Sequence, residues 1–197
     1  MKEPTRSSSQ RFSDNETDLE LLARVGDGDR AAFRELHARY YGPLLRFIYR
    51  ITRRLDLAEE GVNDVMLVVW RDSRAFQGRS TVSTWIMGIA YRKAMKSVVR
   101  AQRWSLRKAA VDFSEWLEHS GPQVEPTAHD DLRDLLDAAL GRLSPDHRAV
   151  VELTYFHGRS YEEIAAIVGC PVNTVKTRMF HARAKLKKLL PTLGEGP

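Results

Sequence analysis

The stretch 160–190 constrains the fold of this chain most, because its pattern predicts two helices joined by a tight turn. Ser160 and Glu163 have the S-x-x-E spacing of a capping box, which marks the start of a helix. Gly169 can adopt the left-handed conformation that ends a helix, and Pro171 cannot extend that helix but can open a new one. The sequence therefore predicts a helix-turn-helix unit whose second helix begins directly after this proline.

The second of these helices has one apolar face, from Val175 to Leu189 at helical spacing, and one polar face. Between residues 174 and 190 it carries six Lys and Arg residues and no Asp or Glu. An ordinary solvated helix would mix charges and would seldom expose a Phe, whereas a helix that reads DNA needs cations for phosphates and polar groups for base edges. We therefore predict a DNA-reading face made of Asn173, Lys176, Thr177, Arg178, Phe180, His181 and Arg183.

Charge and cysteine content narrow the class of protein. The 197 residues include 31 Lys and Arg against 26 Asp and Glu, a net charge of +5, and the chain is long enough for two small domains. The single Cys excludes an internal disulfide, and no spacing of His, Cys, Asp or Glu predicts a metal, a cofactor or a catalytic residue. No apolar run is long enough to span a membrane, and the Ser-rich start lacks the apolar segment of a signal peptide. We expect a cytoplasmic protein without membrane insertion, in which residues 1–18 are disordered.

The part of the chain from residue 19 to residue 71 predicts helices throughout. Apolar residues recur at helical spacing from Leu19 to Ile51, a run that Pro43 is expected to bend or interrupt. A further helix is expected at about 57–71, with acidic residues near its start, which suits the helix dipole. Together with the helices predicted above, this pattern indicates an all-α fold of two small domains joined by a flexible linker.

A second basic segment lies between Ser73 and Val111, where no Asp or Glu occurs. A helix expected from about Thr84 gathers its Lys and Arg residues on one face, and a polar loop precedes it beside aromatic residues. Cations beside aromatic rings suit single-stranded nucleic acid, because phosphates need charge and unstacked bases need flat surfaces. For Trp85, packing in the core and stacking on a base remain alternatives. The candidate residues of this second interface are Arg79, Ser80, Thr81, Trp85, Arg92, Lys93, Lys96 and Arg100.

Three groups of motifs follow one another along the chain: LAEE to VVWR at 57–71, FQGRS with STWI at 76–86, and LSP, YEEIA and TVKTR within 143–178. Taken in this order, they resemble the motifs of the extracytoplasmic-function (ECF, group IV) sigma factors of bacterial RNA polymerase. Each motif is loose by itself, but their order and spacing together are specific, and the resemblance covers residues 19–190. It implies an alternative sigma factor that binds core RNA polymerase and directs promoter-specific transcription initiation, without catalysis by this chain.

The resemblance also implies a role for each part of the chain. Residues 19–104 correspond to sigma region 2 and residues 130–191 to sigma region 4, joined by the linker 105–129 and followed by the tail 192–197. Region 2 is expected to melt and read the minus-ten element, and region 4 to read the minus-thirty-five element and touch the β flap of the polymerase. The helix at 57–71 is expected to dock on the β′ clamp helices through Glu59, Glu60, Asn63, Asp64, Met66 and Trp70.

Four positions depart from the pattern that this family commonly shows. Arg92 and Lys96 stand where the family has Asn and Asp, Val82 where it has Phe, and His181 where it has Arg. The first two substitutions make the melting helix more basic. The last one changes the base preference expected at the upstream element.

Two alternatives use the same residues differently. A stand-alone helix-turn-helix transcriptional regulator would share the stretch 160–190 but would have no use for a strand-melting segment. An all-helical enzyme would need a catalytic or phosphate-binding set that the sequence lacks.

The resemblance further implies an anti-sigma factor as a partner, in addition to double-stranded and single-stranded promoter DNA. The linker carries three apolar residues that are unusual in a free connection: Phe113, Trp116 and Leu117. We expect them to pack either on this chain or on such a partner.

Overall fold

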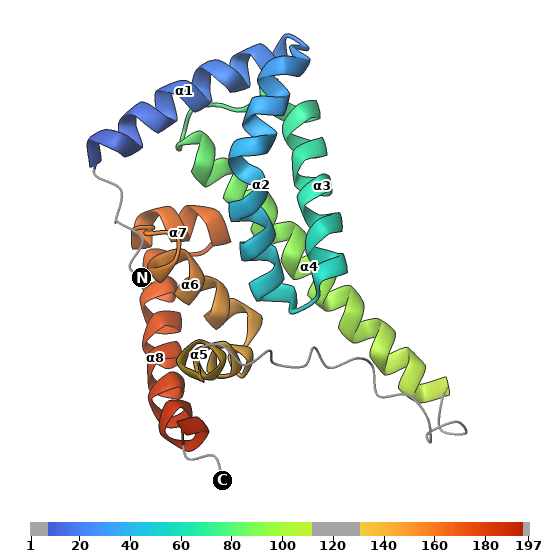
Figure 1. The fold of residues 1–197 in the computed structure, drawn as a ribbon, viewed down its shortest axis with the longest axis vertical. Helices are drawn as coiled ribbons and strands as arrows, with labels where there is room; N and C mark the ends of the chain where they lie inside the picture. The colour runs from blue at the N-terminus through green and yellow to red at the C-terminus, as the bar shows by residue number, and fades with distance from the viewer. Residues whose placement is uncertain (1–7, 112–130, 195–197) are drawn as a thin grey trace.

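The computed structural model describes the backbone of residues 8–111 and 131–194, with side chains over 14–104 and 135–190. Within those ranges the chain contains helices and no strand, which confirms the predicted all-α class. The helices form two groups, α1 to α4 and α5 to α8 (Figure 1). Their bounds are α1 Ser8–Gly26, α2 Arg30–Thr52, α3 Leu55–Asp72, the short 3-10 helix η1 Ser73–Ala75, α4 Val82–Val111, α5 Asp131–Gly141, α6 Pro145–Tyr155, α7 Tyr161–Val168 and α8 Val172–Gly194.

In the first group, α2 and α3 run side by side, and α4 packs against both of them (Figure 1). Helix α2 begins after Asp29, whose carboxylate accepts hydrogen bonds from the backbone nitrogens of Ala31 at 2.7 Å and Ala32 at 3.1 Å. It ends at Arg53, which takes the left-handed conformation with φ 59°. The helix continues through Pro43, so the interruption expected there is absent, and apolar residues before and after the proline are buried in one core.

Helix α1 contradicts the disorder expected for residues 8–18, because it begins at Ser8, while residues 1–7 lie outside the described residues. The side chain of Asn15 accepts a hydrogen bond at 3.1 Å from the backbone nitrogen of Val82, at the start of α4. Asp18 is buried, pairs with Arg39 at 2.7 Å and accepts a hydrogen bond from the hydroxyl of Tyr40. Burial raises the pKa of both Asp18 and Tyr40. These contacts reach across the fold, which is why a local pattern did not reveal them.

The second group contains the predicted helix-turn-helix unit. Ser160 Oγ accepts a hydrogen bond from the nitrogen of Glu163 at 3.2 Å, and the Glu163 carboxylate accepts one from the nitrogen of Ser160 at 2.9 Å. Gly169 ends α7 in the left-handed conformation with φ 71°, and α8 begins at Val172. The capping box, the glycine stop and the start of the second helix are therefore confirmed.

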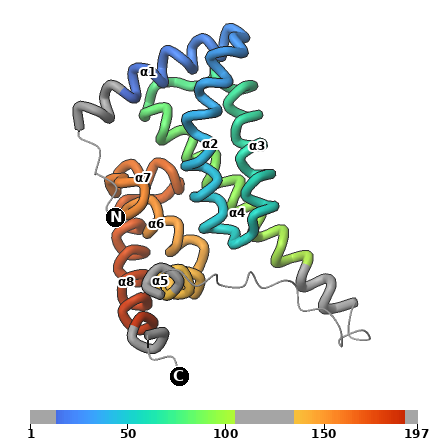
Figure 2. The backbone as a smooth tube through the Cα atoms, viewed as in Figure 1, coloured from blue at the N-terminus to red at the C-terminus, as the bar shows by residue number. Residues whose placement is uncertain are grey.

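The two groups of helices pack against each other. Helix α6 lies against α2 and α7 lies against α4 (Figures 1 and 2). Buried apolar residues of both groups form one continuous cluster. Helix α4 extends to Val111 and α8 to Gly194, so positions 104 and 191, where we expected domains to end, fall inside helices. The linker residues Phe113, Trp116 and Leu117 lie outside the described residues.

Candidate nucleic-acid interface

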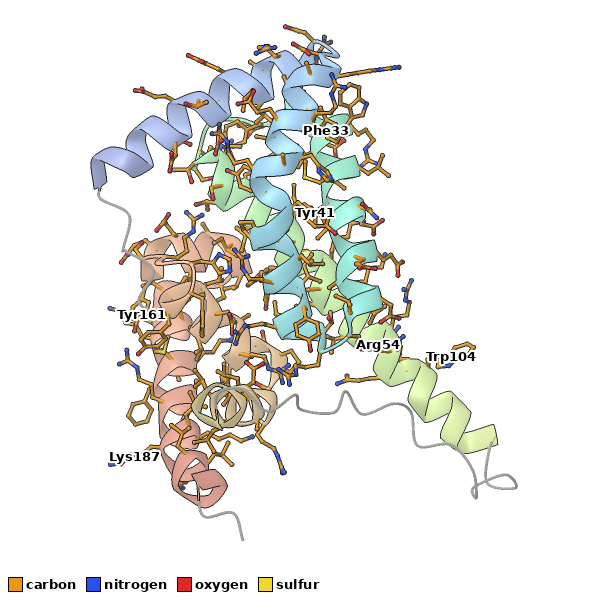
Figure 3. All side chains as sticks on the ribbon, in the orientation of Figure 1. Phe33, Tyr41, Arg54, Trp104, Tyr161 and Lys187 are labelled. Atoms are coloured by element: carbon orange, nitrogen blue, oxygen red, sulfur yellow. The ribbon has the colours of Figure 1, made fainter. Side chains whose placement is uncertain are left out.

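The outer face of α8 presents most of the residues predicted to read DNA, because the opposite face of this helix is packed. Val175, Met179 and Ala182 are buried in the apolar cluster, while Phe180 is 69% exposed. Lys187, further along the helix, also projects into solvent (Figure 3). The predicted residues that the structure places at the surface are Asn173, Lys176, Thr177, Phe180, His181 and Arg183.

Two of the predicted arginines are held by neighbouring side chains. Arg178 is half-buried and pairs with Asp146, at the start of α6, at 3.0 Å. Arg183 stays exposed, but its Nε donates to the hydroxyl of Tyr155 at 3.0 Å and its guanidinium lies 5.7 Å from the centre of that ring. The two arginines therefore differ: Arg183 is oriented at the surface, whereas Arg178 is held half-buried against the start of α6.

His181 lies in a row of three rings at the edge of the exposed face. Its centroid is 5.5 Å from that of Phe180 and 6.2 Å from that of His147, a half-buried residue of α6. Burial, and after it the charge of nearby His181, lowers the pKa of His147. A row of flat rings offers apolar contacts of the kind that a thymine methyl group makes in the major groove.

The loop between η1 and α4 carries a cavity of about 190 Å³. Gly78 takes the left-handed conformation in this loop, with φ 66°. The cavity is lined by Ala75, Phe76, Gln77, Arg79, Ser80 and Trp85. Trp85 is half-buried and its ring lies 5.4 Å from that of Phe76, so it packs on a neighbour and lines the cavity as well. Thr81 does not line the cavity. Its hydroxyl accepts a hydrogen bond from the backbone nitrogen of Thr84 at 3.1 Å and so caps the first turn of α4.

The basic face of α4 is partly neutralised by carboxylates of α3. Lys93 pairs with Asp64 at 2.8 Å, and Arg100 lies 3.4 Å from Glu60. A narrow cleft of about 80 Å³ between the two helices is lined by Glu60, Gly61, Asp64, Lys93, Lys96, Ser97 and Arg100. Among the described residues, no carboxylate lies within 4.0 Å of the charged groups of Arg92 or Lys96, which are both exposed.

Comparisons with known proteins match both groups of helices to one family. Residues 36–105 match the sigma-70 region 2 family and residues 133–186 match the sigma-70 region 4 family. Over 185 residues the chain is 31% identical to the RNA polymerase sigma-H factor of Pseudomonas aeruginosa, which spans 90% of this chain and 96% of that protein. Over 180 residues it is 33% identical to the ECF RNA polymerase sigma factor SigM of Mycobacterium tuberculosis, spanning 91% of this chain and 88% of SigM.

This chain belongs to the ECF family of sigma-70 factors. A solved structure of the sigma factor RpoE in complex with the anti-sigma factor NepR, from Bartonella quintana, resembles it with a TM-score of 0.62 at 29% identity. That match covers 81% of this chain and 96% of RpoE. The family and the fold predicted from the motifs are therefore confirmed.

The surface of α3 in this sigma factor differs from the predicted polymerase-binding set at one clear position. Met66 is only 2% exposed and belongs to the core, so it cannot contact a partner. Trp70 forms a T-shaped pair with Phe33, with 5.1 Å between the ring centroids. Leu67, which the sequence analysis missed, is 61% exposed. Met66 and Leu67 are neighbours in one apolar run of the sequence, and only the orientation of α3 on the core shows which of them is exposed. Of the remaining predicted residues, Glu59, Glu60 and Asn63 are exposed and Asp64 is half-buried.

Sequence reasoning also missed two ionisable residues near the contact of α6 with α2, the buried Glu152 and the half-buried His157. Glu152 is 1% exposed, lies 3.4 Å from Arg50 of α2, and has its pKa raised to about 7 by burial. His157 contacts the ring of Phe47 edge-on at 5.5 Å, and burial lowers its pKa to about 4. Glu152 carried no signal in the sequence, because nearly every side of α6 is covered in the fold, and His157 lies just beyond the end of that helix.

Along the part of this sigma factor that the structure describes, no helix combines the length and apolar character needed to cross a membrane. Within the same residues, no cluster of three or more His, Cys, Asp or Glu side chains is placed to hold a metal ion.

Proposed function

We propose that this sigma factor binds core RNA polymerase and directs initiation at promoters whose upstream element is read by the outer face of α8. The observation that carries the proposal is the division of α8 into a buried apolar face and an exposed face without acidic residues. Such a helix can enter the major groove, where Lys176 and Arg183 would meet phosphates, and Thr177 and Phe180 would meet base edges.

We assign the downstream element to the loop cavity and the basic face of α4. A cavity lined by Phe76, Trp85 and the polar residues of the loop offers both a stacking surface and hydrogen-bonding groups to an unstacked base. The exposed cations Arg92 and Lys96 lie further along the same helix, where they would follow the phosphates of the separated strand. The proposal gives this chain no catalytic step.

We assign polymerase docking to the exposed side of α3. Glu59, Glu60 and Asn63 supply polar groups there, and Leu67 supplies an apolar one, which is the mixture found at protein interfaces. We infer that the β′ clamp helices are the partner at this surface and that the β flap contacts region 4. An anti-sigma factor is a further proposed partner, because the similar RpoE structure contains one.

Reconstitution with core RNA polymerase tests the proposal. Transcripts mapped across the native genome should start at a set of sites that share two sequence elements, and those starts should disappear without the sigma factor. Lys176→Gln combined with Phe180→Ala should weaken initiation from these sites, whereas Arg142→Gln, an exposed cation of the same domain off α8, should not.

The stand-alone regulator remains the competing function, and the same reagents distinguish it. If the isolated chain bound the mapped promoter duplex as tightly as the holoenzyme does, the chain would act without polymerase and the proposal would be wrong. The loop cavity weighs against that outcome, since a protein that binds only duplex DNA has no unstacked base to accommodate.

A further inference from the structure

The first turn of α6 lies beside one flank of the exposed face of α8. There the imidazole of His147 on α6 faces that of His181 on α8, with 6.2 Å between the ring centroids and 39° between the ring planes. His147 is half-buried and His181 is exposed, so the pair runs from the contact between the helices out to the surface. Arg178, three residues before His181 and therefore on the same side of α8, pairs with Asp146 of α6.

The start of α6 holds His147 in place. Ser144 is the N-cap of this helix, and its hydroxyl accepts a hydrogen bond from the backbone nitrogen of His147 at 3.4 Å. Pro145 occupies the first helical position, which favours a helix start at this point. Among the described residues, no hydrogen bond engages a ring nitrogen of His147 or His181. The two imidazoles are therefore well positioned, and their nitrogens have no partner there.

Cations surround His147 on the side of α8. Burial lowers the pKa of His147, and the charges of His181, Arg178 and Lys185 lower it further. Because this pKa lies below the ordinary value for histidine, the imidazole of His147 is neutral at about pH 7 in the free chain.

Asp146, the neighbour of His147 on α6, acts on this pKa in the opposite direction. Its carboxylate is already engaged on two sides, because it pairs with Arg178 at 3.0 Å and accepts a hydrogen bond from the hydroxyl of Tyr91 on α4 at 2.8 Å. The negative charge of Asp146 is thus partly compensated and does not hold a proton on His147. A further anion beside the two imidazoles would favour the protonated form.

A backbone phosphate of the upstream element is an anion of this kind. A helix in the major groove, which is about 12 Å wide, has phosphates on either side of it. Side chains at the centre of the exposed face, such as Thr177 and Phe180, would meet base edges, whereas side chains at its flank would meet phosphates. A protonated imidazole has two N–H donors to offer, and a neutral one has a single donor.

We propose that His147 is a DNA-contacting residue of the upstream site and that, together with His181, it binds one backbone phosphate as an imidazolium. The phosphate contact rests on the proposed function, because it needs the outer face of α8 to lie in the major groove. The proton comes from the solvent and stays on the imidazole, so promoter binding takes up protons. Affinity for the upstream element therefore rises as the pH falls through the range in which the free imidazole is neutral and the bound imidazole is protonated.

Binding of the holoenzyme to a promoter duplex at two pH values, measured by fluorescence anisotropy at saturating core polymerase, tests the role of His147. The unsubstituted factor should bind about threefold more tightly at about pH 6.5 than at about pH 8. His147→Gln cannot take up a proton and should lose this difference. His147→Arg is always charged, so at about pH 8 it should bind as tightly as the unsubstituted factor binds at about pH 6.5.

Matched controls exclude other sources of pH dependence. His37→Gln removes a half-buried histidine of α2 and should keep the full difference between the two pH values. Glu152, whose pKa is raised to about 7, titrates in the same range, but it is unchanged in every variant. On a promoter fragment that lacks the upstream element, His147→Gln should bind like the unsubstituted factor at both pH values. A difference that persisted on that fragment would place the histidine pair away from the upstream element.

Lys176→Gln separates the failure of the histidine contact from the failure of the proposed function. It should weaken binding at both pH values and keep the threefold ratio, because lysine stays charged throughout this range. If Lys176→Gln weakened binding but the pH ratio were the same in every protein, the role of His147 would be overturned and the proposed function would stand. If Lys176→Gln and both His147 variants all bound like the unsubstituted factor, α8 would not lie on the DNA and the proposed function would fail.

Nuclear magnetic resonance of the imidazole protons in the full-length chain examines the pair without DNA. His147 should titrate below the usual range for histidine, and its titration should move to higher pH in His181→Gln, because the charge of His181 lowers its pKa. An unchanged titration in His181→Gln would contradict the coupling of the two rings. Circular dichroism checks the helix content of each variant, and if His147→Gln loses helix, His147→Arg and His181→Gln decide.

Discussion

Helices α4 and α8 of this sigma factor both carry Lys and Arg but no Asp or Glu, and they differ in what surrounds their cations. Beside α4 runs α3, whose Glu60 and Asp64 pair with Arg100 and Lys93. Among the described residues, no helix packs on the outer face of α8, where Lys176, Lys185 and Lys187 are exposed. Where α8 does meet a neighbour, the cation that faces it, Arg178, is paired with a carboxylate as well.

The difference shows that the number of cations in a segment does not measure the charge available to DNA. A paired cation at a surface has already replaced part of its hydration by a partner, and it must give up that partner to bind a phosphate. An exposed, unpaired cation releases a counterion instead, which favours binding. We therefore expect α8 to contribute more affinity per residue than α4.

The largest effect is expected on α8. Lys176→Gln together with Phe180→Ala should weaken holoenzyme binding at the upstream element by about 10-fold to 100-fold, because one phosphate contact and one base contact are lost at roughly 1–3 kcal/mol for a good base contact. The salt dependence of log affinity should fall by about 0.9 for the lysine alone. Fluorescence anisotropy of holoenzyme on promoter duplex at several salt concentrations measures both quantities. An unchanged salt slope would place Lys176 away from the DNA.

Glu60 and Asp64 of α3 pair with cations near the surface, whereas Glu152 of α6 is buried, and its burial lowers the stability of the fold when it is charged. Its pKa is raised to about 7, so the folded state binds more protons than the unfolded state between about pH 4.5 and 7, and stability is lost as pH rises through this window. Glu152→Gln should therefore raise the free energy of unfolding by about 1–3 kcal/mol at pH 8 and by little at pH 4. Arg50 keeps a partner in the variant, because it also pairs with Asp137 at 2.9 Å.

His157 makes stability change with pH in the opposite direction to Glu152, so it provides an internal check on the Glu152 prediction. Its pKa is lowered to about 4, so its contribution to stability is present above its ordinary pKa of 6.5 and is lost as pH falls toward 4. In Glu152→Gln this loss should become visible as a steady rise in stability from pH 4 to 6.5, measured by urea unfolding. Glu20→Gln, an exposed control, should leave the pH profile unchanged, and a flat profile in Glu152→Gln would contradict the assignment.

His181 tests how selective the exposed face of α8 is. Arginine can pair with guanine through two donors, worth about 1–3 kcal/mol of discrimination, whereas a neutral imidazole offers one donor and one acceptor. His181→Arg should therefore sharpen the preference for guanine at one base pair of the upstream element and leave polymerase binding unaltered. Selection from a promoter library measures the base profile, and identical profiles for the two proteins would place His181 outside the groove.

The smallest effects are expected from substitutions of the cations on α4. Comparing the exposed cations with those paired to α3 shows whether pairing reduces the contribution to DNA binding. Arg92→Gln or Lys96→Gln should each lower the salt slope for single-stranded DNA by about 0.7 and weaken binding a few-fold, whereas Lys93→Gln and Arg100→Gln should do less. The isolated chain and a fluorescent oligonucleotide suffice for this measurement. Asp64→Asn provides the converse, because it frees Lys93 and should strengthen binding. Equal losses at all four cations would show that pairing with α3 does not matter.

The features that could be predicted from the amino-acid sequence are local ones. The capping box of Ser160 and Glu163, the glycine stop at Gly169 and the two-sided pattern of α8 involve residues within a few positions of one another. Their geometry follows from backbone hydrogen bonding and helical periodicity, so they can be predicted without knowing what lies nearby. The family followed from the same source, since its motifs are short segments in a given order.

Which polar and apolar side chains are exposed to a partner could not be predicted in this way, because it depends on how the helices pack. Met66 and Leu67 are adjacent in one apolar run, yet the orientation of α3 buries the first and exposes the second. The pairing of Arg178 with Asp146 and the burial of Arg148 between two helix ends likewise join residues from different helices. Burial and ion pairing depend on distances between elements, and those distances are set by how the whole chain packs, which no local pattern in the sequence records.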